Sequence, residues 1–431
     1  MHPLAEELNR ALDGTVAGDL LSDLGRRLYF PRGIVAQSAE AKKLAKRINA
    51  TIGLATRAGK PMFLESIRGQ IDKIEPDEAF PYAPTQGIEA LRELWKQELA
   101  RKNPDLAGKS FSMPLVVPGL TAGISILADL FAGPGVSLVL PDLHWDNYPL
   151  VFETRREARL VTFPLYAPGG GFNVAGMAEA LAAAGGGRVI LLLNFPNNPT
   201  GYSPTTAEAG AIVAAVAAAA RSGTRILVVC DDAYFGLFYE PETFPQSLFA
   251  RFCDLDPRVL AAKVDGSTKE DLTWGFRTGF ITLASKGLGE PHYEALIRKL
   301  MGAVRSTVSN SSVLAQNLVL RAVRSPTYAQ EKREAFEALR ERYLKVKAIL
   351  AARPRDLLQP QPFNSGYFMS FRLLKGKAED LRRELLSQDA VGTIAIDTAV
   401  LRVAFSSVDL GDLEALFEMV YAAAARVAAR G

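Results

Sequence analysis

The sequence predicts an α/β protein with a large, mostly parallel sheet flanked by helices and a smaller α+β domain beside it. Through the middle of the chain, short apolar runs alternate with helical patterns, which is typical of parallel strands joined by crossover helices. Several runs are continuously apolar, as expected for strands that helices cover on both faces. After about residue 310 the pattern changes to charged helical stretches and short strand-like pieces.

Seven apolar runs are the predicted strands of the parallel sheet: Pro114–Val117, Val136–Leu140, Leu160–Phe163, Val189–Leu193, Ile226–Cys230, Val259–Val264 and Phe280–Leu283. Helical patterns lie between them, for example TAEAGAIVAAVAAAARSG at 206–223. In open α/β sheets, ligands bind outside the carboxyl ends of the strands. We therefore expect the polar residues that directly follow these runs to form a site.

The flanking segments also have helical patterns. SAEAKKLAKRINATIGLATRAG begins with Ser38 as its expected N-cap, and an amphipathic helix begins near Ile88. A long charged helix is expected over 327–352. We therefore divide the chain into an N-terminal segment (1–75) that joins the small domain, a large α/β domain (76–310) and a small C-terminal α+β domain (311–431) with strands near Tyr367–Phe371 and Val400–Phe405.

The composition excludes several classes of protein. With 431 residues and 48% hydrophobic content, the chain can bury a large core. A formal charge of +3, with acids and bases interspersed, gives no reason to expect nucleic acid or an anionic membrane as partner. Two cysteines predict neither a disulfide framework nor a metal cluster. With no evident signal peptide or spanning segment, we expect a soluble cytoplasmic protein.

The stretch DGSTKEDLTWGFRTGF places Lys269 in a Gly/Ser/Thr turn, followed by Arg277 between small residues. A partly desolvated lysine amine can form a Schiff base with a carbonyl compound, and an arginine nearby can bind a phosphate. Taken alone, a Ser-Thr-Lys turn is more often solvated surface. The surrounding residues decide between these two interpretations.

Three polar residues follow predicted strands. Asn198, in an Asn-Pro-Thr-Gly turn, can donate its amide to a phenolate-like oxygen, or it can simply shape the turn. Asp231, at the end of a buried strand, can hold a pyridine nitrogen protonated, or it can cap a helix or lie in a solvated loop. Tyr234, three residues later, could reach a hydroxyl on the same ring.

Three further features suit binding of a ring, a phosphate and a carboxylate. A helix start at Gly119, Leu120 and Thr121 offers backbone N–H groups and a hydroxyl to a phosphate, although an ordinary strand–turn–helix corner looks similar. Trp145 offers a flat face for stacking, or it belongs to the core. Arg402, in an apolar strand, either recognises a carboxylate or forms an internal salt bridge.

These signals fit different parts of one cofactor, pyridoxal 5′-phosphate (PLP), and their order along the chain resembles that of the fold-type I PLP enzymes, specifically class I/II aminotransferases of the aspartate/aromatic kind. The motifs that carry the resemblance are NNPTGY, DDAYFGLF, K-x7-R-x-G and RVAF, and it extends from about Tyr82 to Arg402. The resemblance implies that Lys269 forms the Schiff base and that Arg402 binds the substrate α-carboxylate. The remaining implied PLP ligands are Asp231 at the ring nitrogen, Asn198 and Tyr234 at the ring oxygen, Trp145 on the ring face, and Gly119, Leu120, Thr121, Ser267 and Arg277 at the phosphate.

The resemblance also implies a homodimer with shared active sites. Tyr82 would reach the phosphate of the neighbouring subunit, and Arg305, in AVRSTVSNSS, would bind the distal carboxylate of an acidic substrate across the dimer. Two positions depart from the family pattern. Gly266 stands where many relatives have a phosphate-binding serine, and Tyr148 stands where the acidic subgroup has a histidine that supports the ring-nitrogen aspartate.

The implied reaction is transamination between an L-amino acid and a 2-oxo acid, with 2-oxoglutarate as the expected acceptor and aspartate or an aromatic amino acid as the expected donor. A PLP-dependent lyase, cyclase or oxidase on the same fold remains open, because no local feature separates these outcomes. A ligand-sensing regulator is disfavoured, since the roughly 75 residues before Tyr82 lack a basic recognition pattern.

Overall fold

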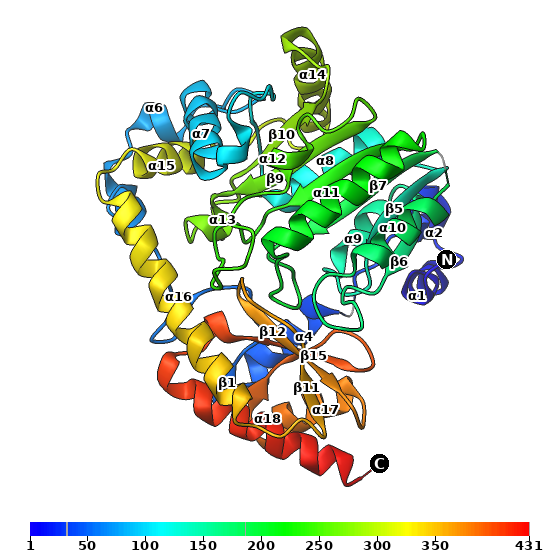
Figure 1. Ribbon diagram of the computed structural model, residues 1–431, viewed down its shortest axis with the longest axis vertical. Coiled ribbons are helices and arrows are strands. Elements are labelled where there is room, and N and C mark those ends of the chain that lie inside the picture. The colour runs from blue at the N-terminus through cyan, green and yellow to red at the C-terminus, as the bar shows by residue number, and fades with distance from the viewer. Residues whose placement is uncertain (32, 186, 431) are drawn as a thin grey trace.

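The computed structural model describes residues 1–31, 33–185 and 187–430. Its central sheet has seven strands in the order β4-β10-β9-β8-β7-β5-β6 (Figure 1). β10 runs antiparallel to both of its neighbours, and every other neighbouring pair is parallel. The seven-stranded, mostly parallel sheet is therefore confirmed. The strands are β4 (Leu115–Val117), β5 (Val136–Pro141), β6 (Arg159–Phe163), β7 (Arg188–Asn194), β8 (Arg225–Asp231), β9 (Val259–Gly266) and β10 (Gly279–Ser285).

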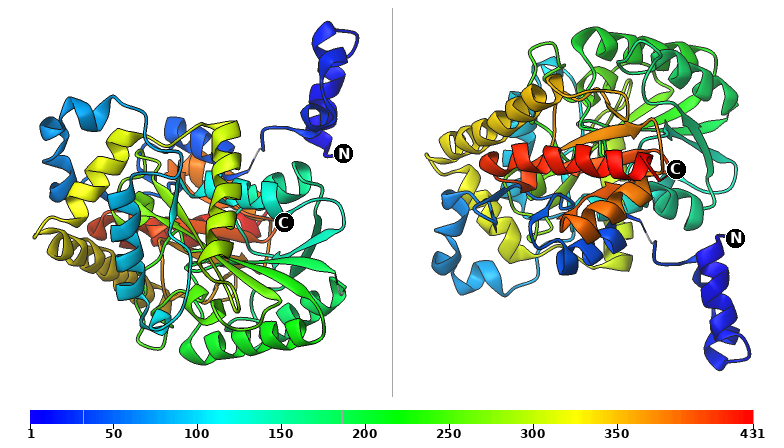
Figure 2. Two further views of the ribbon diagram at one scale, coloured as in Figure 1. Left: turned by 90° about the horizontal axis from the view of Figure 1, so that it is seen from above. Right: turned by 90° about the horizontal axis from the view of Figure 1, so that it is seen from below.

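Helices cover both faces of this sheet (Figure 2). Successive residues of β7 belong to different hydrophobic clusters: Ile190 packs with residues of α8 (Leu120–Phe131) and α14 (Glu290–Thr307), whereas Leu191 packs with residues of α10 (Val174–Ala183) and α11 (Thr206–Arg221). Because side chains alternate between the faces of a strand, burial on both sides requires continuously apolar runs. This is the physical reason for the pattern seen in the sequence.

A second, four-stranded antiparallel sheet forms from the C-terminal part of the chain, in the order β11-β12-β15-β14. The N-terminal segment joins this region, because β1 pairs in parallel with β13. Residues from both ends of the chain therefore pair in this region, and the division into a large and a small domain stays a prediction. The elements are β1 (Ile48–Asn49), β11 (Leu358–Pro360), β12 (Phe368–Leu373), β13 (Val391–Gly392), β14 (Ile394–Ala395), β15 (Val400–Ala404), α16 (Tyr328–Ala351), α17 (Ala378–Gln388) and α18 (Leu413–Ala428).

The N-terminal helix prediction needs correction. The helix α4 spans Ile34–Leu44 and its N-cap is Gly33, so Ser38 lies inside the helix and does not cap it. The chain after Leu44 is not helical but forms short strands, because Ile48 pairs with Val391 in the small domain. Tertiary pairing overrides local helix propensity in this segment.

Before α4, three short helices form an arm that projects from the body of the molecule (Figure 2). They are α1 (Pro3–Leu12), α2 (Val16–Leu20) and α3 (Asp23–Arg27). The remaining elements are β2 (Thr56–Arg57), β3 (Lys60–Pro61), α5 (Glu65–Arg68), α6 (Pro76–Ala79), α7 (Glu89–Lys102), α9 (Asn147–Pro149), α12 (Phe249–Phe252), α13 (Ser267–Glu270), α15 (Val313–Val323) and the short 3₁₀ and π turns Ile71–Lys73, Pro104–Leu106, Leu150–Thr154, Phe405–Ser407 and Leu410–Asp412.

Across the described ranges, no helix combines the length and apolar character needed to cross a bilayer. Nor do three or more His, Cys, Asp or Glu side chains in those ranges come together in an arrangement that could hold a metal ion. Cys230 and Cys253 are both buried as free thiols.

Candidate active site

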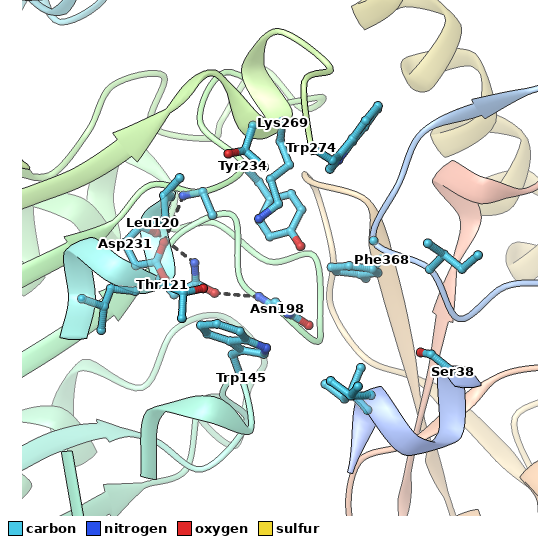
Figure 3. Close-up of a pocket in the computed structure, with 18 of the residues that line it drawn as sticks. Ser38, Leu120, Thr121, Trp145, Asn198, Asp231, Tyr234, Lys269, Trp274 and Phe368 are labelled. Atoms are coloured by element: carbon cyan, nitrogen blue, oxygen red, sulfur yellow. Dashed lines mark hydrogen bonds between the residues drawn. The ribbon is translucent and has the colours of Figure 1, made fainter. Parts of the chain in front are cut away.

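A cavity of about 400 Å³ lies at the carboxyl ends of the central strands and is lined on its far side by residues of α4, β12 and β15 (Figure 3). This is the edge of the sheet at which the sequence predicts a site. Nine of the predicted site residues line the cavity: Leu120, Thr121, Trp145, Asn198, Asp231, Tyr234, Lys269, Arg277 and Arg402.

Lys269 follows β9 on the short helix α13, and its Nζ lies 4.7 Å from the centre of the Tyr234 ring. Burial lowers the pKa of Lys269 to about 8; the negative charge of Asp231 opposes this shift and the positive charge of Arg277 adds to it. A larger share of the amine is therefore neutral near neutral pH than for an ordinary lysine. A neutral amine is the form that attacks a carbonyl carbon.

Asp231 ends β8 and is buried beneath the cavity. Its Oδ2 accepts a hydrogen bond of 2.5 Å from the Tyr148 hydroxyl, and its Oδ1 accepts one of 3.1 Å from the Ala233 N–H. Burial raises the pKa of Asp231, and the Tyr148 bond and the charge of Lys269 oppose that shift. Tyr148, which the sequence shows as a departure from the family, thus supports this carboxylate directly.

The first turn of α8 forms a cradle with Arg277. Gly119 caps this helix with φ +86°, and a Cβ added at Gly119 would lie 2.4 Å from Nη2 of Arg277, so the guanidinium packs against bare backbone. The hydroxyl of Thr268, which also lines the cavity, is buried without a hydrogen-bond partner among the described residues. Unpaired helix N–H groups, a guanidinium and a free hydroxyl are the donor set that binds phosphate.

Gly266 has a steric explanation in this structure. A Cβ at this position would lie 2.5 Å from the carbonyl oxygen of Thr278 and 2.7 Å from Cα of Gly279. A serine here would force the backbone of β10 to move. Ser267 does not take its place at the cavity: it is not among the lining residues, and its hydroxyl accepts a 3.0 Å hydrogen bond from Thr273.

Arg402 lies on β15 with 2% of its surface exposed. Its Nη1 donates to Asn198 Oδ1 at 2.8 Å and its Nη2 donates to the Thr51 carbonyl at 2.9 Å, while its Nε has no partner in the described part of the chain. Burial lowers the pKa of Arg402 to about 10. None of its contacts among the described residues is with an acid, so the structure contradicts the internal salt bridge and leaves this charge available to a carboxylate.

Asn198 also faces the cavity rather than shaping its turn. The turn is held by Asn197, whose Oδ1 accepts hydrogen bonds from the backbone N–H and the hydroxyl of Thr200. The Asn198 side chain instead accepts the bond from Arg402, and Figure 3 shows it pointing into the cavity near Trp145. Of the two interpretations of this asparagine, the ligand-binding one agrees with its position.

The family model for aminotransferase class I and II matches residues 54–420. The chain belongs to this aminotransferase family. The match covers both sheets and every residue that the preceding paragraphs place at the cavity, apart from α4 and the Thr51 carbonyl.

Curated relatives match at low identity. The aspartate/prephenate aminotransferase of Cereibacter sphaeroides is 27% identical over 74% of this chain and 75% of its own length. The mitochondrial aspartate aminotransferase of Dictyostelium discoideum is 29% identical over 38% of this chain, and the chain spans 39% of the length of that relative. Among solved structures, an aminotransferase from Anaerococcus prevotii has a TM-score of 0.82 at 22% identity, covering 93% of this chain and 98% of that one, which shows the aminotransferase fold.

Two predicted residues of this aminotransferase chain lie away from its cavity. Tyr82 is 91% exposed, between α6 and α7. Arg305 is exposed near the end of α14, where its Nη1 donates to Ser309 Oγ at 2.5 Å. Both were assigned to the active site of a second subunit, so their distance from the cavity of their own chain is compatible with that prediction and does not test it.

The sequence interpretation missed the apolar part of the lining. Ile34 and Val35 of α4, Ile52, Trp274 and Phe368 all line the cavity. No short motif marks such residues, because an apolar side chain looks the same in a core and in a pocket. Trp274 gives one further signal: its indole N–H is buried without a partner among the described residues.

Proposed function

We propose that the protein is a PLP-dependent aminotransferase that moves an amino group from an L-amino acid to a 2-oxo acid. The observation that carries the proposal is the convergence of Lys269, Asp231 and Arg402 on one cavity. An amine of lowered pKa, a buried carboxylate and a buried guanidinium without an acidic partner are the groups that this chemistry requires.

The residues present fit the cofactor. The first turn of α8, Arg277 and Thr268 would hold its phosphate, and Asp231, supported by Tyr148, would face its ring nitrogen. Trp145 would stack on the ring, while Asn198 and Tyr234 would bind the ring oxygen. When bound, PLP supplies a covalent anchor for the substrate amine and accepts the electron pair released at the substrate α-carbon.

The side chains supply positioning and proton transfer. Arg402 binds the substrate α-carboxylate with the help of Asn198, which fixes the α-carbon near Lys269. The Lys269 amine then removes the α-proton as general base and returns it in the second part of the reaction. The apolar side chains of α4 and β12 limit the access of water to this region.

Two observations bear on the identity of the amino donor, and they favour different amino acids. The apolar lining from Ile34, Val35 and Phe368 favours an aromatic or other apolar amino acid. The names of the two curated relatives favour aspartate, and an acidic donor would require Arg305 of a second subunit in a homodimer. We also propose that 2-oxoglutarate is the acceptor and that the protein is located in the cytoplasm.

An assay of a panel of amino acids with 2-oxoglutarate tests the proposed function. Glutamate formed and ammonia released are both measured. Glutamate with a matching 2-oxo acid supports transamination. Ammonia without glutamate would instead support the PLP-dependent lyase or oxidase. Binding of amino acids without any turnover would support a ligand-sensing role.

A further inference from the structure

A second cavity lies at the opposite end of the central strands from the active site, between the end of α8 and the start of α14. Its volume is about 570 Å³. The floor consists of apolar side chains on one face of the sheet, Ile190, Leu227 and Leu260, and the wall includes Phe131 and Leu296. A cavity of this size falls in the range of small-molecule sites.

Three arginines line this cavity, one from each of three neighbouring strand starts. Arg188 and Arg225 are direct partners in the parallel register of β7 and β8. Arg258 immediately precedes β9, and its carbonyl oxygen accepts the N–H of Ile226, which puts it in the same row. Residues in one row of a sheet point to the same face. The three arginines therefore extend from the same face of the sheet, from backbone positions spaced by ~4.8 Å from strand to strand.

This row has little compensating negative charge. Neither Arg188 nor Arg225 makes a side-chain hydrogen bond or ion pair within the described part of the chain, and no Asp or Glu is among the lining residues. The acid near the row is Asp256, whose Oδ1 lies 3.9 Å from Nη1 of Arg258 and accepts the Arg258 backbone N–H at 2.8 Å. Like charges side by side on a sheet destabilise it, so an anion bound across the row would relieve a repulsion that Asp256 compensates only at Arg258.

We propose that this cavity binds a small amphiphilic anion, with a phosphate or carboxylate head on Arg188, Arg225 and Arg258 and an apolar body over Ile190, Leu227 and Leu260. Guanidinium groups bind both heads through paired hydrogen bonds. The apolar floor favours a head that is attached to a hydrophobic body. The site uses no residue of the active site, so the proposal does not depend on the proposed function.

Calorimetry on the PLP-loaded protein tests the proposal with four probes: decyl phosphate, decanoate, decanol and inorganic phosphate. We expect one site per chain for decyl phosphate, decanoate or both, and affinities about tenfold or more lower for decanol and inorganic phosphate. The comparison of decyl phosphate with decanoate identifies the preferred head. Equal binding of decanol, or of inorganic phosphate alone, would overturn the proposal.

Variants test whether the anion binds at this cavity or elsewhere on the protein. Arg188→Gln combined with Arg225→Gln should weaken decyl phosphate about tenfold or more, whereas Arg221→Gln, an exposed arginine at the end of α11, should leave it unchanged. Ala295→Trp, which fills the cavity from α14, should weaken decyl phosphate while turnover of the amino donor persists as the measure of folding. Undiminished binding in the double variant would show that the anion binds elsewhere and would end the proposal.

Discussion

At the scale of single residues, Lys269 has a nucleophilic amine whose buried surroundings keep it neutral in a larger fraction of the molecules than for an ordinary lysine. Lys269→Ala should abolish the covalent attachment of PLP that borohydride reduction makes permanent, and should lower turnover by about 10³-fold or more, since general-base catalysis alone contributes a factor of this order. Mass spectrometry of the reduced protein measures the attachment. Lys286→Ala, at an exposed position, serves as the control. Near-normal turnover in the Lys269 variant would refute the assignment.

The acid–base behaviour of Lys269 gives a second prediction. In the cofactor-free protein, the rate at which a trace acylating reagent labels Lys269 should rise with pH, with a midpoint at about pH 8. This midpoint is well below the pKa near 10.4 of an ordinary lysine. Because Asp231 favours the charged amine and Arg277 disfavours it, Asp231→Asn should lower the midpoint and Arg277→Gln should raise it. Shifts of the same sign in both variants would contradict the proposed electrostatics.

Tyr148 is a positioning residue that acts through Asp231. Tyr148→Phe removes the hydrogen bond to Oδ2 and should raise the pKa of the Asp231 carboxyl further, because that bond opposes the effect of burial. We expect PLP affinity to fall about tenfold, as for the loss of a hydrogen bond to a charged group, and the alkaline side of the activity profile to be retained better than the acidic side. An unchanged affinity and pH profile would mean that Tyr148 only fills space.

At the scale of elements, the junction of a strand with the following helix positions Lys269 and the Gly119–Thr121 turn. β4 and α8 are joined at Gly119, where the positive φ and the close approach of Arg277 exclude a side chain. Gly119→Ala should therefore lower the stability by about 1–3 kcal/mol and weaken PLP binding. Gly210→Ala, at an open position inside α11, should instead be neutral or stabilising. Urea unfolding and PLP titration measure the two effects, and equal behaviour of the two variants would contradict the cradle.

The helices and strands themselves were predicted well where they are long and periodic. All seven predicted strands of the large sheet, the helix that starts after Ile88 and the helix over Tyr328–Ala351 are present. The helix predicted from Ser38 is present only up to Leu44 and is not capped by Ser38. Its continuation was wrong, because Ile48 is held by a strand that follows it by more than 300 residues. Local propensity cannot reveal such a partner.

At the scale of the whole molecule, the proposed dimer predicts sharing of active sites. If Arg305 reaches the site of a second subunit, mixing Lys269→Ala chains with Arg305→Gln chains after unfolding and refolding should restore activity toward aspartate, since one site of each hybrid then has both residues intact. Neither variant alone should show this activity. Lack of restoration in a mixture shown by mass to contain hybrid dimers would exclude a shared site. Activity toward an aromatic donor should depend little on Arg305.

The sequence by itself determined the class of sheet, the order of the elements and the identity of most polar groups at the cavity, because buried strands and the motifs around Asn198, Asp231 and Lys269 leave local patterns. Only the tertiary structure decided which groups meet and which are left without partners. The bond from Tyr148 to Asp231, the bonds of Arg402 to Asn198 and Thr51, and the apolar lining from Ile34 and Phe368 all join segments distant in the chain. Such contacts depend on how the chain packs as a whole, and no stretch of sequence contains both partners.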